Sequence, residues 1–170
     1  HSLTKAPEFI IAKNRDSSYN WDCFHIGLDD TTKGLRLNTS ETPLSGRWGT
    51  VNSSIITTKN AYTHVGTDKY VFYAWHSVEG YSSFGKFEGN SNTDGPMIVT
   101  NFRPRLVFCK SIDASENWQV RDTARSTFNA DSQVRIYWNS DGAEGSSSTA
   151  SPIDFLSNGF KVRQPTGYGY

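Results

Sequence analysis

The chain has 170 residues, of which 35% are hydrophobic, 14% aromatic and 20% charged. Ser, Thr and Asn add about 29%, and a composition this polar and aromatic favours β-sheet over helix. Basic and acidic residues balance at 17 each, with no basic block that would attract a phosphate backbone, so nucleic acid is not expected as a partner. No apolar run approaches the roughly 18 residues of a membrane-spanning helix, and membrane insertion is not expected either.

Five strands are predicted in the first half of the chain, each an apolar or alternating run bounded by polar turn residues. They cover residues 9–13, 21–26, 33–38, 54–58 and 69–77. A turn rich in Ser, Asp and Asn joins the first two, so these strands are predicted to form a hairpin. The last strand is strongly aromatic, with the sequence Lys-Tyr-Val-Phe-Tyr-Ala-Trp-His-Ser.

A connector follows at residues 80–102, where glycines alternate with aromatic residues. Glycine permits sharp changes of direction, and the aromatic side chains between the glycines need a surface to pack against. The segment is too aromatic for a flexible linker. We therefore expect extended strands that pack between two modules and hold them together.

An internal repeat is the most informative feature of the sequence. Residues 7–22 align without a gap on residues 104–119 at a constant shift of 97, with six identities in sixteen positions. One of these identities is the pair Trp21 and Trp118. Two copies of one module are predicted, and both tryptophans are expected to be buried in equivalent cores because they share a position in the module.

The second copy is predicted to contain the same order of strands. These strands cover residues 106–110, 118–121, 133–138 and 154–156. In the third strand, residues 35–37 fall on residues 134–136 at a shift of 99. In the alignment of the two copies, residue 170 corresponds to the start of the aromatic strand of the first copy. We therefore expect the second copy to lack that strand. Because a bare sheet edge is rarely tolerated, we expect the natural chain to continue or a strand from elsewhere to take this position.

These elements predict an all-β protein made of two similar antiparallel β-sandwich modules of jelly-roll or concanavalin-like type. Module 1 is expected at residues 1–79, the connector at residues 80–102, and an incomplete module 2 at residues 103–170. Cys23 and Cys109 are expected to be free, buried thiols, and a single bridge between them is the alternative.

The sequence contains no recognisable catalytic, metal or cofactor motif. Metal sites need clustered His, Cys, Asp or Glu side chains, whereas the four histidines are scattered and the pair Asp29 and Asp30 is typical of a solvated turn. A GxSxG nucleophile motif is absent, and no pair of carboxylates is predicted to face across a groove. We therefore expect no enzyme activity, no catalytic residue, no metal and no cofactor.

Two tryptophans outside the aligned repeat are the candidate ligand-binding residues. Trp48 and Trp138 lie beside polar loops, and an exposed indole can stack on a sugar ring or on a neighbouring subunit. The same reasoning applies to the terminal tyrosines Tyr168 and Tyr170.

Two further stretches carry a resemblance to a known family. Residues 80–96 follow the pattern GYxxFGxFxGNxxxDGP, and residues 153–161 follow IDFLxNGFK. Over nearly its whole length the chain resembles a repeated domain of unassigned function found in structural proteins of tailed bacteriophages, especially marine ones. In that family the last segment is followed by an aromatic strand, which agrees with an incomplete second module. The family offers no catalytic residues to carry over, and its association with concanavalin-like folds on tail fibres favours a sandwich.

The resemblance implies a non-catalytic virion structural protein on the extracellular particle surface, in a tail fibre, spike or capsid-surface appendage. Its expected partners are other virion subunits, in a homo-oligomer, and a host-surface glycan. Shallow binding by aromatic and polar groups would gain strength from many copies. The sequence does not separate host adhesion from virion assembly. The alternative is a free-standing, lectin-like carbohydrate-binding module.

Overall fold

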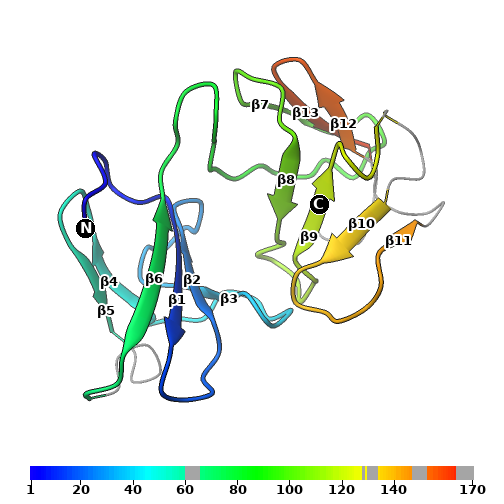
Figure 1. Cartoon of the computed structure of the whole chain (residues 1–170). Helices are drawn as coiled ribbons and strands as arrows, with labels where there is room; N and C mark the ends of the chain where they lie inside the picture. Colours follow the sequence, from blue (N-terminus) through cyan, green and yellow to red (C-terminus); the bar gives the residue numbers. More distant parts are fainter. Residues whose placement is uncertain (60–65, 128, 130–133, 147–152, 164–170) are drawn as a thin grey trace. The chain divides into compact units, whose positions relative to one another are not determined.

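The structure is a computed structural model, and it describes residues 1–59, 66–127, 129, 134–146 and 153–163. Within these residues the chain forms thirteen β-strands and no helix, arranged as small antiparallel sheets (Figure 1). The prediction of an all-β protein is therefore confirmed. In the described part of the chain there is no helix that could span a lipid bilayer.

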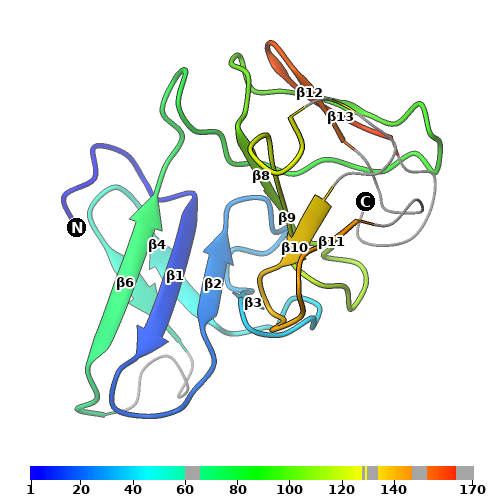
Figure 2. The ribbon, with the colours of Figure 1, turned by 45° about the vertical axis from the view of Figure 1, so that its right-hand side comes forward.

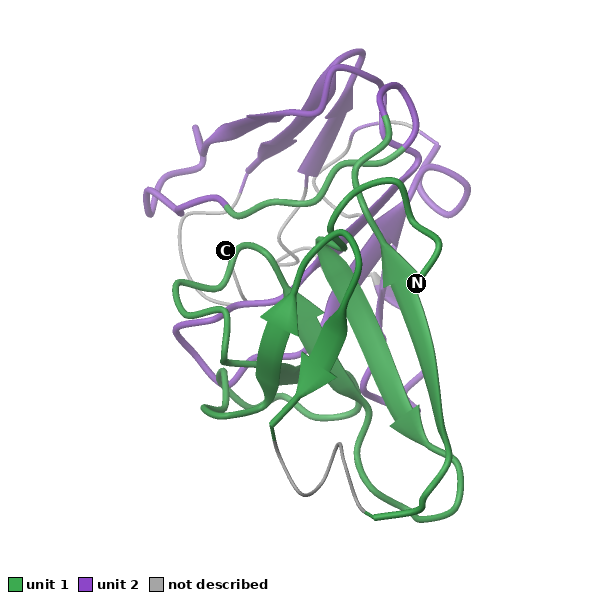
Figure 3. Ribbon diagram, turned by 90° about the vertical axis from the view of Figure 1, so that its left-hand side faces the viewer, with its two compact units in different colours: residues 1–78, 82–86 green, residues 79–81, 87–170 purple. Residues whose placement is uncertain are grey.

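Two compact units divide the chain, and Figure 3 colours them separately. Unit 1 comprises residues 1–78 and 82–86, and unit 2 comprises residues 79–81 and 87–170. The segment predicted as a connector therefore contributes to both units. Its Phe84 stacks on Phe9 in unit 1, with ring centroids 6.0 Å apart.

Unit 1 is built on a four-stranded antiparallel sheet with the strand order β3-β2-β1-β6, and Figure 2 shows β6, β1 and β2 side by side. Its strands are β1 (Phe9–Asn14), β2 (Asp22–His25), β3 (Leu35–Arg36) and β6 (Tyr70–Trp75). Every residue of β1 except Lys13 is buried, as expected for a central apolar strand with a neighbour on each edge.

A two-stranded hairpin completes the core of unit 1. Its strands are β4 (Trp48–Val51) and β5 (Ile56–Thr58). From β4, the fully buried Trp48 joins three buried residues of the four-stranded sheet, which are Ile10, Ala12 and Phe24. The partly buried side chains Val51, Ile56 and Ala74 pack against this cluster.

Unit 2 contains a four-stranded and a three-stranded antiparallel sheet. The first has the order β11-β10-β9-β8, with β8 (Leu106–Cys109), β9 (Gln119–Asp122), β10 (Val134–Tyr137) and β11 (Gly145–Ser146). The second has the order β12-β13-β7, with β7 (Met97–Val99), β12 (Ile153–Leu156) and β13 (Gly159–Val162). Strand β7 lies in the predicted connector, which is therefore extended at that point.

The core of unit 2 joins its two sheets. Its buried members are Val107, Ile153, Phe155, Phe160 and Val162. The segment with the pattern IDFLxNGFK forms the hairpin of β12 and β13, in which Leu156 pairs with Gly159 across a two-residue turn. A Cβ atom on Gly159 would lie 2.0 Å from the carbonyl oxygen of Ile98 in β7, so only glycine fits where these strands meet.

The backbone reproduces the internal repeat. In unit 1, β1 pairs with β2 from Phe9 opposite His25 onward, and in unit 2, β8 pairs with β9 from Leu106 opposite Asp122 onward. All four residue pairs of the first hairpin recur in the second at the shift of 97. The predicted hairpins and their alignment are confirmed at these positions.

The third strand of the repeat aligns differently from the prediction. Cys23 lies opposite Leu35 in unit 1, and Val120 lies opposite Ile136 in unit 2. Since Val120 is the counterpart of Cys23, the true shift at the third strand is 101. The predicted shift of 99 is wrong by two residues.

An asparagine pair closes each hairpin at the same place, and we call it the asparagine clasp. In unit 1, the Asn38 Oδ1 atom accepts a hydrogen bond from the Trp21 amide at 3.0 Å, and its Nδ2 atom donates to Asn20 Oδ1 at 2.8 Å. The clasp of unit 2 consists of Asn139, the Trp118 amide at 2.8 Å and Asn117 Oδ1 at 2.7 Å. Clasp residues 38 and 139 differ by 101, which independently supports the corrected alignment.

The two repeated tryptophans have different environments. Trp118 is 3% exposed, as predicted, and stacks on Phe108 with ring centroids 4.9 Å apart. Trp21 is 36% exposed, so the prediction of a buried side chain is wrong for this residue. The counterpart of Phe108 in unit 1 is Ile11, which has no ring to cover the indole, and the Lys13 ammonium lies 5.8 Å from the Trp21 ring centroid instead.

The repeat does not extend to the predicted fourth strand. Strand β5 pairs with the strand before it, whereas β12 pairs with the strand after it. The strand orders establish an all-β fold of several small antiparallel sheets. They do not by themselves define a jelly roll or a concanavalin-like sandwich.

Candidate functional site

Trp48, one of the two predicted ligand-binding residues, is part of the core of unit 1. Its side chain is fully buried, and its indole N–H donates to the backbone oxygen of Cys23 at 3.1 Å. The ring packs edge-on against Phe24, with centroids 5.9 Å apart. A buried indole offers no surface to a ligand, so the structure removes Trp48 from the candidate site.

Trp138, the other predicted ligand-binding residue, is half-exposed in unit 2. Its ring lies 4.6 Å from that of Phe108, and its amide donates to the backbone oxygen of Trp118 at 3.0 Å. Trp138 and Trp48 belong to different units. Because its ring is exposed, Trp138 stays a candidate ligand contact. Tyr168 and Tyr170 lie outside the described residues.

Strand β6 presents a second aromatic surface, which we call the aromatic platform. It consists of Tyr73 and Trp75, whose side chains are 47% and 41% exposed. Their rings are nearly parallel, with an interplanar angle of 18° and centroids 6.2 Å apart. Trp75 also stacks on the buried Phe9 at 5.5 Å, so the core holds the platform in a fixed orientation. Exposed rings held in this way can stack on a sugar or on a partner's side chain.

Glu8 fixes the chain at the end of the platform. Its carboxylate accepts hydrogen bonds from both the amide and the hydroxyl group of Ser77, just beyond β6. The Ser77 Oγ atom in turn accepts from the Phe84 amide at 3.1 Å. These contacts anchor the residues that follow Trp75 and limit the movement of its ring.

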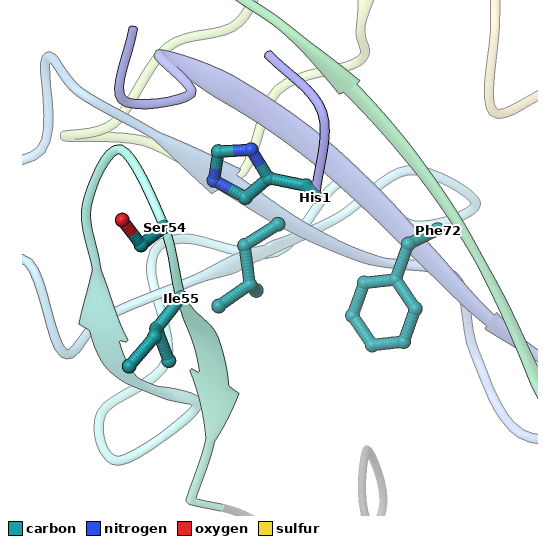
Figure 4. Close-up of a pocket in the computed structure, with 5 residues that line it drawn as sticks. His1, Ser54, Ile55 and Phe72 are labelled. Atoms are coloured by element: carbon teal, nitrogen blue, oxygen red, sulfur yellow. The ribbon is translucent and has the colours of Figure 1, made fainter. Parts of the chain in front are cut away.

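A shallow hollow of about 380 Å³ opens beside Phe72 in unit 1 (Figure 4). The residues that line it are His1, Ser54, Ile55, Ile56 and Phe72. Because side chains alternate along a strand, Phe72 points to the face of β6 opposite the platform. The lining is mostly apolar, and the His1 ring is already hydrogen-bonded to the Asn52 carbonyl oxygen at 2.9 Å. This hollow suits an apolar side chain of a protein partner better than a sugar.

Asp29 and Asp30 both have partners in the structure. Asp29 pairs with Lys86, which lowers the pKa of its carboxyl, and Asp30 accepts two hydrogen bonds from Thr32 at 2.8 Å. This agrees with the predicted turn role of the Asp29–Asp30 pair. Across the described residues, no group of three or more His, Cys, Asp or Glu side chains could hold a metal ion.

One buried ion pair lies in unit 1. The Asp22 carboxylate is 3.7 Å from the Arg47 guanidinium, and both side chains are buried. Burial raises the pKa of Asp22, although Arg47 and Arg36 act in the opposite direction. Its counterpart in the repeat is Gln119, an uncharged residue that is also buried. The pair is part of the unit 1 interior.

Both cysteines are free thiols, Cys23 buried and Cys109 half-buried. Burial raises the pKa of Cys109 to about 12, so its reactive thiolate form is scarce at neutral pH. These thiols are therefore poor candidates for a nucleophile.

The sequence reasoning missed the aromatic platform, although it predicted the strand that carries it. Tyr73 and Trp75 are two residues apart in the predicted strand 69–77, and this spacing places them on one face. Their exposure depends on β6 lying at a sheet edge, which strand prediction alone does not reveal.

Comparison with known proteins identifies the family of the chain but finds no named relative. No curated protein matches the sequence, and no solved structure matches it. The model of one family, described as a domain of unknown function, matches residues 1–168. The predicted resemblance to a domain of unassigned function over nearly the whole chain is confirmed to that extent. The chain belongs to the family of this domain of unknown function, DUF7483.

Proposed function

We propose that the chain is a non-catalytic structural protein of a bacteriophage virion, in a tail fibre, spike or capsid-surface appendage, where it binds a host-surface glycan. The phage context comes from the resemblance of residues 80–96 and 153–161 to repeated domains of phage structural proteins. The observation that carries the binding role is the aromatic platform of Tyr73 and Trp75, two exposed, nearly parallel rings on strand β6.

Several features support a glycan as the ligand of the platform. The chain has equal numbers of basic and acidic residues, which suits an uncharged partner better than a polyanion. Aromatic faces match the apolar faces of sugar rings, and stacking on a prearranged platform loses little side-chain entropy. A single shallow contact of this kind is weak. Presentation in a homo-oligomer on the particle surface would strengthen it by roughly 10²- to 10⁴-fold.

We further propose that each unit is a small β-sandwich. In unit 1 the support comes from Trp48 on the β4 hairpin, which packs on the four-stranded sheet. In unit 2 it comes from Phe155 and Phe160 of the three-stranded sheet, which share a core with Val107 of β8. Two sheets joined by one apolar core are the defining feature of that architecture.

A glycan-array screen of the full chain tests the proposed function. Saturable binding is expected, and Tyr73→Ala and Trp75→Ala should each weaken it about tenfold, equivalent to about 1.4 kcal/mol. Tyr81→Ala is the matched control, because Tyr81 is an exposed aromatic residue outside the platform and the change should leave binding unaltered. Trp138→Ala measures the separate contribution of unit 2. Absence of binding by the folded chain would refute the glycan role.

In the alternative proposal, the chain is a free-standing lectin-like module that also binds a glycan through the platform but is not part of a virion. Antibodies against the chain should label intact virions of a phage that encodes it, at a tail or surface appendage. Glycan binding combined with absence of the chain from purified particles would favour a free-standing carbohydrate-binding module.

A further inference from the structure

Strand β8 forms one end of the four-stranded sheet of unit 2. Its first edge pairs with β9, and no strand in the described part of the chain pairs with its second edge. Its counterpart in the repeat, β1, has a strand on both edges, because β6 pairs with it from Phe9 opposite Trp75 to Asn14 opposite Tyr70. The repeat therefore identifies the kind of element that fits beside β8.

Side chains are less buried in β8 than in β1, as expected for a strand that has a neighbour on one edge only. Phe9 in β1 is 6% exposed, whereas its counterpart Leu106 in β8 is 55% exposed. The next three residues of β1 are all buried, whereas only Val107 among the corresponding residues of β8 is buried. The strand sequence Leu-Val-Phe-Cys is thus wholly apolar and only partly covered.

Backbone direction is also favourable at this edge. The Thr123 amide donates to the Arg105 carbonyl oxygen at 3.0 Å, so Arg105 faces β9. Because hydrogen-bonding direction alternates along a strand, Leu106 directs its N–H and C=O groups to the opposite, open side. Within β8 there is neither a charged residue nor a proline, which are the usual devices that block edge-to-edge pairing.

We propose that the open edge of β8 is a binding site for an extended segment of a partner protein, which joins the sheet as an antiparallel strand in the manner of β6 on β1. The segment would place a large aromatic residue opposite Leu106, as Trp75 lies opposite Phe9. It would place a small apolar residue opposite Val107, as Ala74 lies opposite Ile10. Main-chain hydrogen bonds supply affinity and the alternating side chains supply specificity. This interaction requires neither a glycan nor a virion, so it stands or falls separately from the proposed function.

A synthetic peptide with the sequence of residues 69–77 is the probe. In β6 the Lys69 carbonyl oxygen accepts from the Arg15 amide at 2.8 Å, so Val71 and Tyr73 also direct their N–H groups toward β1. Phe72 and Ala74 direct theirs the other way. A peptide N-methylated at Phe72 and Ala74 should therefore bind the full chain, and one N-methylated at Val71 and Tyr73 should bind at least tenfold more weakly. These two peptides have identical composition and form a matched pair.

Variants at one residue of the protein locate the site. Leu106→Pro removes the outward amide without removing a hydrogen bond to β9, and it should weaken peptide binding at least tenfold. Leu106→Thr keeps that amide and should bind within about threefold of the wild type. Hydrogen exchange should show fast exchange of the Leu106 amide in the free chain and protection after addition of the peptide. This last readout does not depend on the folding of any variant.

Four results would overturn the proposal. They are failure of the peptide N-methylated at Phe72 and Ala74 to bind, equal binding of both methylated peptides, and binding that Leu106→Pro leaves unchanged. The fourth is a Leu106 amide that is already protected in the free chain, either within the monomer or through self-association seen in sedimentation.

Discussion

The asparagine clasp yields a quantitative prediction, because the same two hydrogen bonds occur at a part-buried site in unit 2 and at an exposed site in unit 1. Asn139→Ala removes the acceptor of the Trp118 amide and the donor to Asn117. Asn38→Ala removes the equivalent contacts in unit 1. The two substitutions delete the same atoms, so they differ only in what surrounds the clasp.

The expected free-energy costs follow from the burial of the two tryptophans. Each hydrogen bond contributes about 1 kcal/mol, and a buried donor left without a partner costs about 1–3 kcal/mol. Trp118 is 3% exposed and the clasp around it is part-buried, so water replaces the lost Asn139 acceptor poorly, and Asn139→Ala should lower the free energy of unfolding by about 2–3 kcal/mol. Trp21 is partly exposed and its amide can bond to water, so Asn38→Ala should cost about 1 kcal/mol or less.

Urea denaturation followed by tryptophan fluorescence and by circular dichroism measures both costs. With a urea dependence of about 1 kcal/mol per M for a unit of this size, Asn139→Ala should move the midpoint of unit 2 by about 2–3 M. Asn38→Ala should move that of unit 1 by at most about 1 M. Equal shifts, or a larger shift for Asn38→Ala, would refute the argument that burial decides the strength of the clasp.

Two further predictions concern the unit 1 core and a turn in unit 2. Gly34→Ala should destabilise unit 1 by about 1–3 kcal/mol in urea denaturation, because the new Cβ would lie 2.7 Å from Trp48 Nε1; the control Gly85→Ala has open space and should be neutral. Burial acts to raise the pKa of Asp122, but the Arg125 amide and guanidinium hold that pKa below 3.8. Stability from the ionised Asp122 is therefore present above pH 3.8 and lost as pH falls through the folded pKa. Asp122→Asn should cost about 1 kcal/mol at pH 7, and the difference from the wild type should narrow below pH 3.8; a constant difference would contradict this assignment.

The hairpins could be predicted because their information is local. A short apolar run, a polar turn and a second run define β1 with β2 and β8 with β9, and the equal turn lengths preserve the pairing register. The predicted shift of 99 at the third strand is wrong because it aligns Arg36 with Arg135, which are identical in type but do not have equivalent pairing partners. The corresponding asparagines, Asn38 and Asn139, would have given the correct shift of 101, since their side chains hold the strand in place.

The candidate site was harder to predict because exposure depends on distant segments. Trp48 has polar neighbours in the sequence, yet the hairpin that carries it places it against Phe24 in the core. Trp21 and Trp118 have the same backbone contacts and different exposure. Phe108 stacks on the Trp118 ring, whereas the counterpart of Phe108 in unit 1 is the aliphatic Ile11. Periodicity specifies which residues share a face of a strand, but not whether another element covers that face.

The aromatic platform and the open edge of β8, the two surfaces for which we propose binding, both arise from a structural difference between the two copies of the repeat. In unit 1, β6 occupies the second edge of β1 and carries Tyr73 and Trp75, so the platform exists because this strand is present. In unit 2, no described strand takes the equivalent place, and Leu106 is exposed for that reason. A repeat with β6 in both copies would have two platforms and no open β8 edge. The asymmetry between the copies, rather than the repeated hairpin itself, therefore accounts for both candidate binding surfaces.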